Sequence, residues 1–196
     1  GANEADSLKC LEQITNFRTL YNAKNYKDAY ESWQYVIQNC PCAWDGIYTN
    51  AQTLFQNLIK DEKDSAHREV LIDSLMYTFD VRSNHFPEKF SSGLGFKAYN
   101  TMRYRKSQYE QAYTWFVQSV EMEKENTQPA IWDTYYQLAE NMTKAKKDTS
   151  IVIEAYERAT DYLDLSILNA TKAYEQSADA LEALNAQLEQ GEIDRM

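Results

Sequence analysis

Apolar residues recur along most of this chain at intervals of three and four positions, which is the spacing of one face of a helix. Short polar or charged stretches interrupt the pattern, and Pro41, Pro87 and Pro129 lie at three of these breaks. Residues 87–95, which contain Ser91-Ser92-Gly93, are predicted to form the clearest loop. The pattern predicts helices, most of them in consecutive pairs, over residues 7–23, 26–39, 43–60, 66–84, 96–105, 109–125, 130–145, 151–165 and 171–190.

One local motif occurs twice. In each copy a Tyr opens a helix, a small Ala follows three positions later, and an aromatic residue follows four positions after that: Tyr26, Ala29 and Trp33, then Tyr109, Ala112 and Phe116. This spacing places all three side chains on one helix face, with the Ala where a neighbouring helix comes close. Self-similarity of this kind predicts a stack of helix pairs, an architecture that usually binds rather than catalyses.

These residues resemble the second-helix motif of the tetratricopeptide repeat (TPR) family. The match is carried by Tyr26, Ala29, Trp33, Val36 and Pro41, and again by Tyr109, Ala112, Phe116 and Ser119. The chain departs from the family at Phe17 and Asn100, where Gly or Ala is usual, and in the lengthened second pair. Its aromatic content, its long acidic repeats and the Asn25-Tyr26-Lys27-Asp28-Ala29 turn also resemble repeat proteins of the Bacteroidetes cell envelope.

The resemblance implies an all-α fold, a right-handed superhelical stack of antiparallel helix pairs (a TPR-like α-solenoid) with a C-terminal capping helix. We expect a single domain over residues 1–196. Its parts would be repeats at 7–42, 43–87 (lengthened), 94–128 and 129–165 (divergent), followed by a capping helix at 170–191.

Composition and charge narrow the classes of ligand. Five glycines and three prolines in 196 residues, with 13% aromatic residues, favour an ordered helical protein. A net charge of −10 disfavours nucleic acid, which needs a basic stripe, and also disfavours anionic membrane surfaces. No apolar run approaches the roughly 20 residues of a membrane-spanning helix, so we expect no direct membrane insertion.

Three cysteines form the sharpest local constellation. Cys10 lies near the start of the first predicted helix, while Cys40 and Cys42 end the second, so an antiparallel pair would bring them together. We expect a disulfide from Cys10 to Cys40 or to Cys42; the alternative is three reduced, packing cysteines. A disulfide favours an exported, periplasmic or cell-envelope location over a cytoplasmic one. The leading Gly is typical of a residue left by tag removal, so the natural chain is expected to begin upstream.

Catalytic, metal and cofactor sites are not predicted. The two histidines, His67 and His85, have no Cys or His at zinc spacing, and no basic sequence neighbour activates a cysteine. Gly93-Leu94-Gly95 lacks the third Gly and the Lys of a phosphate loop, and is interpreted as a hinge or turn. The acidic runs resemble a solvated helix face. We therefore expect a protein that is not an enzyme and that carries no cofactor.

Surface recognition remains. The resemblance implies a concave groove that binds a peptide or protein segment, making the chain a non-enzymatic interaction scaffold. Three alternatives stay open: an aromatic platform for carbohydrate at Tyr48, Tyr104 or Trp132, a carboxylate-pair hydrolase, and a structural module of a longer chain. The partner and the oligomeric state are not predicted. The groove residues implied by the resemblance are Arg18, Tyr21, Asn22, Tyr48, Gln52, Phe55, Lys97, Tyr104 and Arg105.

Overall fold

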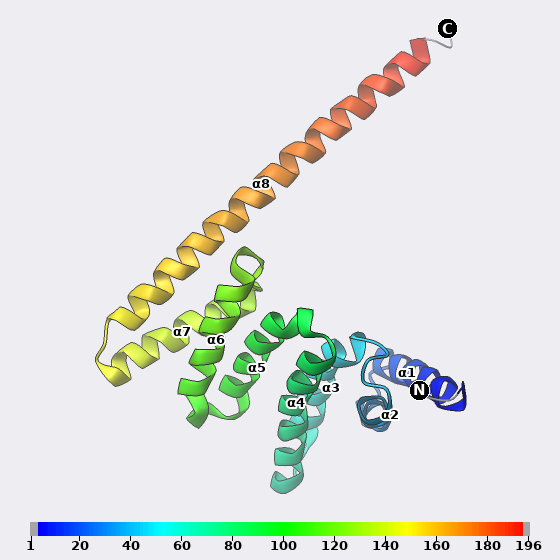
Figure 1. Cartoon of the computed structure of the whole chain (residues 1–196), viewed down its shortest axis with the longest axis vertical. Coiled ribbons are helices and arrows are strands. Elements are labelled where there is room, and N and C mark those ends of the chain that lie inside the picture. The colour runs from blue at the N-terminus through cyan, green and yellow to red at the C-terminus, as the bar shows by residue number, and fades with distance from the viewer. Residues whose placement is uncertain (1–3, 194–196) are drawn as a thin grey trace. The chain divides into compact units, whose positions relative to one another are not determined.

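The computed structural model describes residues 4–193, apart from the side chains of residues 4, 5, 187–189 and 191–193. The described chain consists of helices joined by short turns (Figure 1). It contains eight α-helices and three short 3₁₀ helices. The α-helices are α1 (Glu4–Asn22), α2 (Tyr26–Asn39), α3 (Gly46–Asp61), α4 (Ser65–His85), α5 (Phe90–Tyr104), α6 (Tyr109–Glu123), α7 (Pro129–Lys146) and α8 (Ser150–Ile193). The 3₁₀ helices are η1 (Pro87–Lys89), η2 (Lys106–Gln108) and η3 (Lys124–Asn126).

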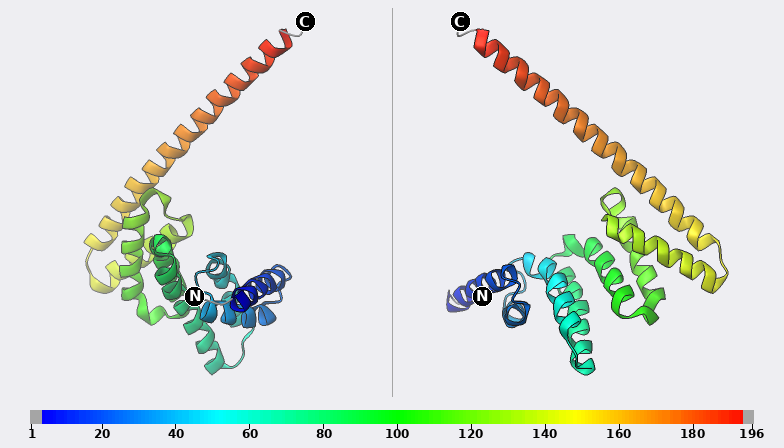
Figure 2. Two further views of the ribbon diagram at one scale, coloured as in Figure 1. Left: turned by 45° about the vertical axis from the view of Figure 1, so that its right-hand side comes forward. Right: turned by 180° about the vertical axis from the view of Figure 1, so that it is seen from behind.

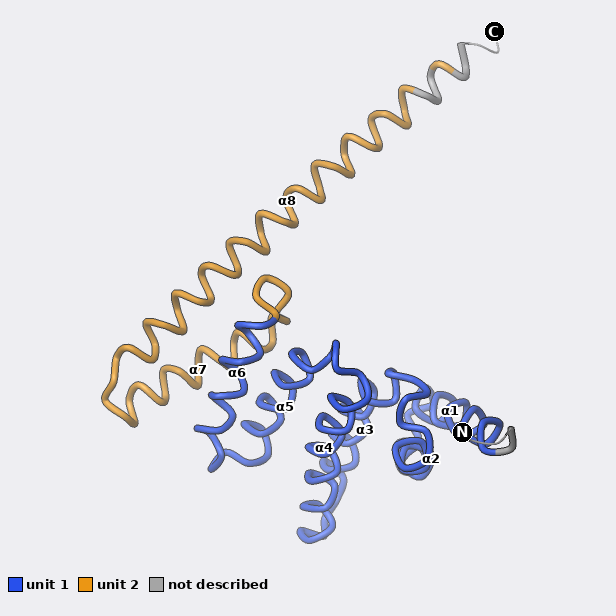
Figure 3. Tube along the Cα trace, viewed as in Figure 1, with its two compact units in different colours: residues 1–122 blue, residues 123–196 orange. Residues whose placement is uncertain are grey.

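Consecutive helices pack as antiparallel pairs, which confirms the predicted all-α class and the sequential pairing. Figure 3 shows that the chain divides into two compact units, residues 1–122 and residues 123–196. The boundary falls at the end of α6, after the third predicted pair. α2 begins and ends where the apolar pattern predicts, because Asn25 and Cys40 flank an uninterrupted amphipathic segment.

The core of the first unit is rich in aromatic side chains. Phe17 and Phe55 are fully buried, and the rings of Phe55 and Trp33 lie perpendicular to one another with centroids 4.8 Å apart. Ala29 is also fully buried, so the repeated motif does place its small residue inside the packing. The second copy behaves alike, since Ala112 and Phe116 have no exposed surface.

One predicted loop is wrong. Residues 87–95 form η1 and the first turns of α5 instead, and Gly93-Leu94-Gly95 is helical rather than a hinge. These three residues are buried, and a Cβ added to Gly93 would meet Ser83 of α4 at 3.9 Å. Burial of this segment against α4 offsets the low helix propensity of glycine, which a sequence-based propensity argument does not include.

A hydrogen bond and a cation–π contact connect α6 to α5. The Ser119 hydroxyl donates a hydrogen bond of 2.8 Å to the backbone carbonyl of Ser91. The Lys97 ammonium lies 4.6 Å from the centroid of the Trp115 ring, at cation–π distance. Asn100, where the TPR family has Gly or Ala, is fully buried, and its amide donates to the carbonyl of Phe96 at 2.8 Å.

The second unit consists of η3, α7 and α8. α7 and the first part of α8 form an antiparallel pair, seen from two further directions in Figure 2. The pair packs through Trp132, whose ring centroid lies 6.1 Å from those of Tyr135 and Tyr162. The Asp148 carboxylate caps α8 by accepting from the backbone N–H of Ser150 at 3.0 Å.

The expected break between residues 165 and 171 is wrong, because α8 runs without interruption from Ser150 to Ile193. Residues 166–170 contain neither Gly nor Pro, so nothing stops the helix. Residues 167–186 are exposed, including Tyr174, Leu181 and Leu184. The described part of the expected capping helix is thus the continuation of α8 and packs against no apolar surface of its own unit.

Candidate functional site

Three cations from three helices surround one surface pocket of the first unit. Lys60 lies near the end of α3, Arg68 in the first turn of α4 and Arg103 near the end of α5. The pocket has a volume of about 420 Å³, and its other lining residues are Gln56, Ile59, Glu62 and Tyr104. We call this set the basic pocket.

None of the three cations has a carboxylate partner among the described residues. The Arg68 Nε–H donates to the backbone carbonyl of Ile59, another lining residue, at 3.4 Å. The Arg103 guanidinium lies 5.5 Å from the centroid of the Tyr104 ring. The chain carries 30 acids and only 20 Lys and Arg residues, yet three of these cations line one pocket. A pocket of this composition can accept an anion.

Tyr104 supplies a neutral hydrogen-bond donor to the same pocket. Burial raises the pKa of its phenol, while the nearby Arg103 and Arg68 guanidinium groups act in the opposite sense. The net effect is a raised pKa, so the hydroxyl keeps its proton at neutral pH. It can donate that proton in a hydrogen bond to an anion held by the cations.

Glu62 is the one acid in the lining of the basic pocket, and both of its carboxylate oxygens have other partners. Its Oε1 accepts from the backbone N–H of Asp64 at 2.8 Å, and its Oε2 lies 2.5 Å from Nδ1 of His67. These contacts lower the pKa of Glu62, with the Asp64 backbone bond as the largest cause. Glu62 therefore keeps its negative charge at neutral pH.

Two of the predicted groove residues belong to the core. Tyr48 is 2% exposed and Phe55 is fully buried, so neither can line a ligand groove. The two residues are seven positions apart, so they lie on the same face of α3, which also carries Ala51 and Leu54. Trp132, one of the expected sugar platforms, is 8% exposed and presents no free ring face.

Two further groove residues are occupied by ion pairs between helices. Lys97 of α5 pairs with Asp80 of α4 at 2.5 Å. Arg105, which directly follows α5, pairs with Glu69 at 3.2 Å and Asp73 at 2.5 Å. These cations join α5 and its C-terminal cap to α4.

The remaining groove residues are dispersed. Arg18 is exposed and lies 5.5 Å from the Trp44 ring centroid. The Tyr21 ring stacks on Phe17, with centroids 5.6 Å apart, and is half-buried. Asn22 is exposed and Gln52 half-buried. Of the nine predicted residues, only Tyr104 lines the basic pocket.

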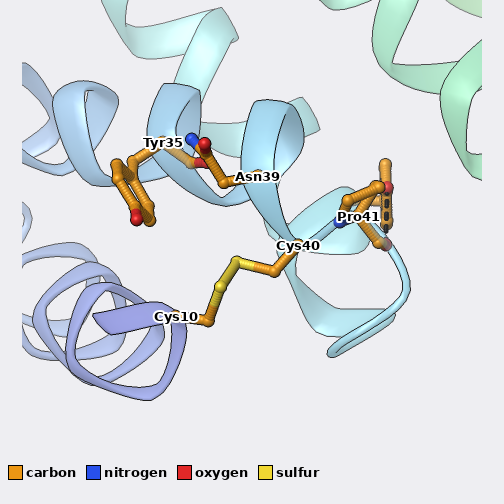
Figure 4. The surroundings of a disulfide bond; sticks show 6 residues. Cys10, Tyr35, Asn39, Cys40 and Pro41 are labelled. Atoms are coloured by element: carbon orange, nitrogen blue, oxygen red, sulfur yellow. Dashed lines mark hydrogen bonds between the residues drawn. A yellow bond between two sulfur atoms is a disulfide. The ribbon is translucent and has the colours of Figure 1, made fainter. Parts of the chain in front are cut away.

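The cysteine pairing left open by the sequence is Cys10–Cys40, with Cα atoms 6.2 Å apart (Figure 4). Cys42 is exposed and has its own neighbour, since its Sγ lies 3.1 Å from Nδ1 of His85. The expectation that no base adjoins a cysteine holds along the sequence but is wrong in space, because His85 lies 43 residues further along the chain.

A second pocket, metal ligation and membrane spanning are the further candidate functional features. A larger pocket of about 530 Å³ is lined by both Lys24 and Lys27 and by Glu31, Asp61 and Glu62, so its charge is mixed. Within residues whose side chains are described, no group of three or more His, Cys, Asp or Glu residues is arranged to hold a metal ion. No described helix combines the length and apolar character needed to cross a bilayer.

Comparisons of the chain with protein-family models, with curated proteins and with solved structures give no match. The site is therefore argued from its own geometry. Sequence reasoning missed Lys60, Arg68 and Arg103 because no local motif links them. The available signal was weak: three cations near helix ends in a strongly acidic chain.

Proposed function

We propose that the chain is a non-enzymatic scaffold for protein–protein interaction and that it binds an acidic peptide segment at the basic pocket. The observation that carries this proposal is the convergence of Lys60, Arg68 and Arg103, without an acid partner in the described structure, on one pocket of a chain with a net charge of −10. The pocket brings three cations together with one acid, Glu62, so positive charge remains in excess there. This excess raises the electrostatic free energy of the unliganded protein, and an anionic ligand relieves it.

The proposed architecture is a divergent, right-handed TPR-like stack. Its support is the sequential antiparallel pairing of the helices and the burial of Ala29 and Ala112 at corresponding motif positions. In such a stack each pair covers the apolar face of its neighbour and leaves a surface built from several helices. The basic pocket has that character, since its residues come from α3, α4 and α5 and from the turn between α3 and α4.

The ligand chemistry follows from the donors. Two guanidinium groups can each form paired hydrogen bonds with a carboxylate, the Lys60 ammonium adds a third positive charge, and the Tyr104 hydroxyl adds a neutral donor. A volume of about 420 Å³ accommodates one or two acidic side chains or a terminal carboxylate. The partner is thus a protein with an acidic segment. The Cys10–Cys40 disulfide supports an exported, cell-envelope location for this chain and therefore for its partner.

The test is fluorescence anisotropy with two labelled peptides of equal length. One contains a run of Asp and Glu, and the other contains Asn and Gln at the same positions. Hydrogen bonds to charged groups are worth about 1.5–3 kcal/mol each, so we expect the acidic peptide to bind at least about tenfold more tightly. The overall charge of −10 opposes this result, which makes preferential binding of the acidic peptide diagnostic. Equal affinities, or no binding of either peptide, would refute the proposal.

A further inference from the structure

Cys42 combines three properties that the scaffold function does not use. It is exposed, it is the cysteine left outside the disulfide, and its Sγ lies 3.1 Å from Nδ1 of His85. A cysteine reacts as its thiolate, so a base at hydrogen-bond distance makes it a nucleophile. In the tautomer that carries its proton on Nε2, the His85 ring can accept the thiol proton at Nδ1.

The Cys10–Cys40 disulfide, an electrophile, lines the same pocket as this thiol. The backbone N–H of Ala43 donates to the carbonyl of Cys40 at 3.0 Å, so Cys40 and Cys42 occupy the first and third positions of one tight turn. Cys10, Cys40 and Cys42 line the same surface pocket, which has a volume of about 710 Å³. Figure 4 shows the disulfide bridging from α1 to the end of α2, immediately before this turn.

Two contacts hold the turn against the end of α4, where His85 lies. The Tyr48 hydroxyl donates to the carbonyl of Pro41 at 2.8 Å, and the Tyr48 ring packs edge-on against Phe86, with centroids 5.8 Å apart. Pro41 lies between the two cysteines, and Phe86 follows His85. Tyr48 therefore connects the residue before Cys42 to the residue after His85.

The second contact is a bidentate ion pair. Arg82 donates from Nε and Nη2 to the two carboxylate oxygens of Asp45, at 2.7 and 2.9 Å. The Arg82 side chain is 11% exposed and that of Asp45 29% exposed, so solvent screens the pair only in part. Asp45 lies three residues after Cys42, and Arg82 three residues before His85. These two contacts thus hold Cys42 and His85 near one another.

We propose that Cys42 and His85 form a thiol–disulfide exchange site whose substrate is the Cys10–Cys40 disulfide. The Cys42 thiol gives its proton to Nδ1 of His85, and the thiolate attacks Sγ of Cys10. The Cys10–Cys40 bond breaks as the Cys10–Cys42 bond forms, and Cys40 leaves as a thiolate that takes the proton back from His85. The number of disulfides and thiols is unchanged, so no external oxidant or reductant takes part.

The consequence is a pair of disulfide isomers that interconvert. Both tie α1 to the turn after α2, but they leave different thiols: Cys42 in one, Cys40 in the other. Peptide mapping distinguishes them. The full-length chain is given a short pulse of N-ethylmaleimide in its native state and digested without reduction, and the labelled cysteine is located by tandem mass spectrometry.

We expect the label on both Cys42 and Cys40 in the unmodified chain, with at least several per cent on Cys40. The Cys42→Ser variant should take up almost no label, because its remaining cysteines stay paired. In the Cys40→Ser variant, mild oxidation should join Cys10 to Cys42. Label confined to Cys42, or failure of the Cys40→Ser variant to form the Cys10–Cys42 bond, would overturn the exchange.

The role of His85 is tested by the rate at which Cys42 reacts with an aromatic disulfide reagent, followed by absorbance. Because His85 is exposed, the His85→Ala variant should fold, and its rate should fall at least about fivefold. Added imidazole should restore part of that rate and leave the unmodified chain unaffected. His67→Ala, which removes the other histidine of α4, is the matched control and should react normally. Equal rates for His85→Ala and the unmodified chain would remove His85 from the site.

Discussion

Two groups of cations lie close together around α4 and α5, and they differ in their partners. Lys97 faces Asp80, and Arg105 faces Glu69 and Asp73, so these cations join α5 and its C-terminal cap to α4. Arg103, only two residues before Arg105, joins Lys60 and Arg68 at the basic pocket, where none of the three has an acid partner among the described residues. Residue type alone thus does not separate a cation that pairs with acids of a neighbouring helix from one that has no such partner.

The difference originates in the acidic face of α4. Glu69, Asp73 and Asp80 follow one side of that helix and neutralise the cations that pack against it. Arg68 precedes this series, in the first turn of α4, and the end of α3 beside it contributes Lys60 rather than an acid. The basic pocket therefore lies at the end of the helix pair where the interhelical ion pairs stop.

The largest expected effect comes from reversing charge in the basic pocket. The double variant Arg68→Glu/Arg103→Glu should weaken binding of the acidic peptide at least about thirtyfold, because two charge-assisted contacts become repulsive. Anisotropy titration measures this loss. Lys89→Glu/Lys106→Glu is the matched control, since it makes the same change in net charge at two exposed positions outside the pocket. A similar loss in both variants would mean that only the overall field of the protein matters.

Salt should separate the two groups of cations next. Raising ionic strength from about 0.05 M to 0.5 M shortens the Debye length from roughly 14 Å to 4 Å. We expect peptide affinity to fall about tenfold, while the melting temperature changes little because exposed ion pairs contribute little to stability. The paired measurements are anisotropy and thermal unfolding in the same buffers. Affinity that is insensitive to salt would contradict an electrostatic site.

The Tyr104 hydroxyl is expected to contribute a smaller amount. Tyr104→Phe keeps the ring beside Arg103 and removes the donor, so the acidic peptide should bind roughly three- to tenfold more weakly, as expected for loss of one hydrogen bond. Titration calorimetry gives the affinity, and circular dichroism checks the fold. Tyr99→Phe on the same helix is the matched control. Unchanged affinity for Tyr104→Phe would exclude its hydroxyl from the site.

The fold was largely predictable, because helices leave a periodic record. The ends of α2 and the sequential pairing follow from apolar spacing alone. The failures occur where tertiary contacts decide: buried Gly93-Leu94-Gly95 continues a helix, and nothing between 165 and 171 ends one. A break requires a residue that stops the helix or a packing reason to turn, and sequence shows only the first.

The candidate site was much less predictable. Lys60, Arg68 and Arg103 are each ordinary surface residues in the sequence, and only the packing of three helices brings them together. Tyr48 and Phe55 show the opposite error, because the TPR resemblance assigned them to a groove while their shared apolar stripe with Ala51 indicated the core. Where a family pattern and the periodicity disagreed, the periodicity was correct.

Replacing a cation that pairs with α4 should lower stability and leave peptide affinity nearly unchanged, whereas replacing a pocket cation should mainly lower peptide affinity. Arg105→Ala removes two ion pairs whose acids are largely exposed, so it should lower the free energy of unfolding by only about 0.5–1 kcal/mol. Peptide affinity should change less than about twofold. Urea unfolding and anisotropy provide the two values. Arg105→Ala binding as weakly as the double pocket variant would erase the distinction between the groups.

The smallest expected effect concerns Glu62, the acid in the lining of the basic pocket. Glu62→Gln removes one negative charge near the cations, so the acidic peptide should bind about two- to threefold more tightly at neutral pH.

The same substitution should lower the stability of the protein at neutral pH. The Asp64 backbone N–H and His67 hold the pKa of Glu62 below its usual value in the folded chain, so between the folded and unfolded pKa values the unfolded chain binds more protons. The contribution of Glu62 to stability is therefore complete above the usual glutamate pKa and is lost as pH falls through the lowered one. Melting temperatures of the two proteins should differ at neutral pH and converge in acid; a difference that persists below that window would mean that Glu62 acts through its shape rather than its charge.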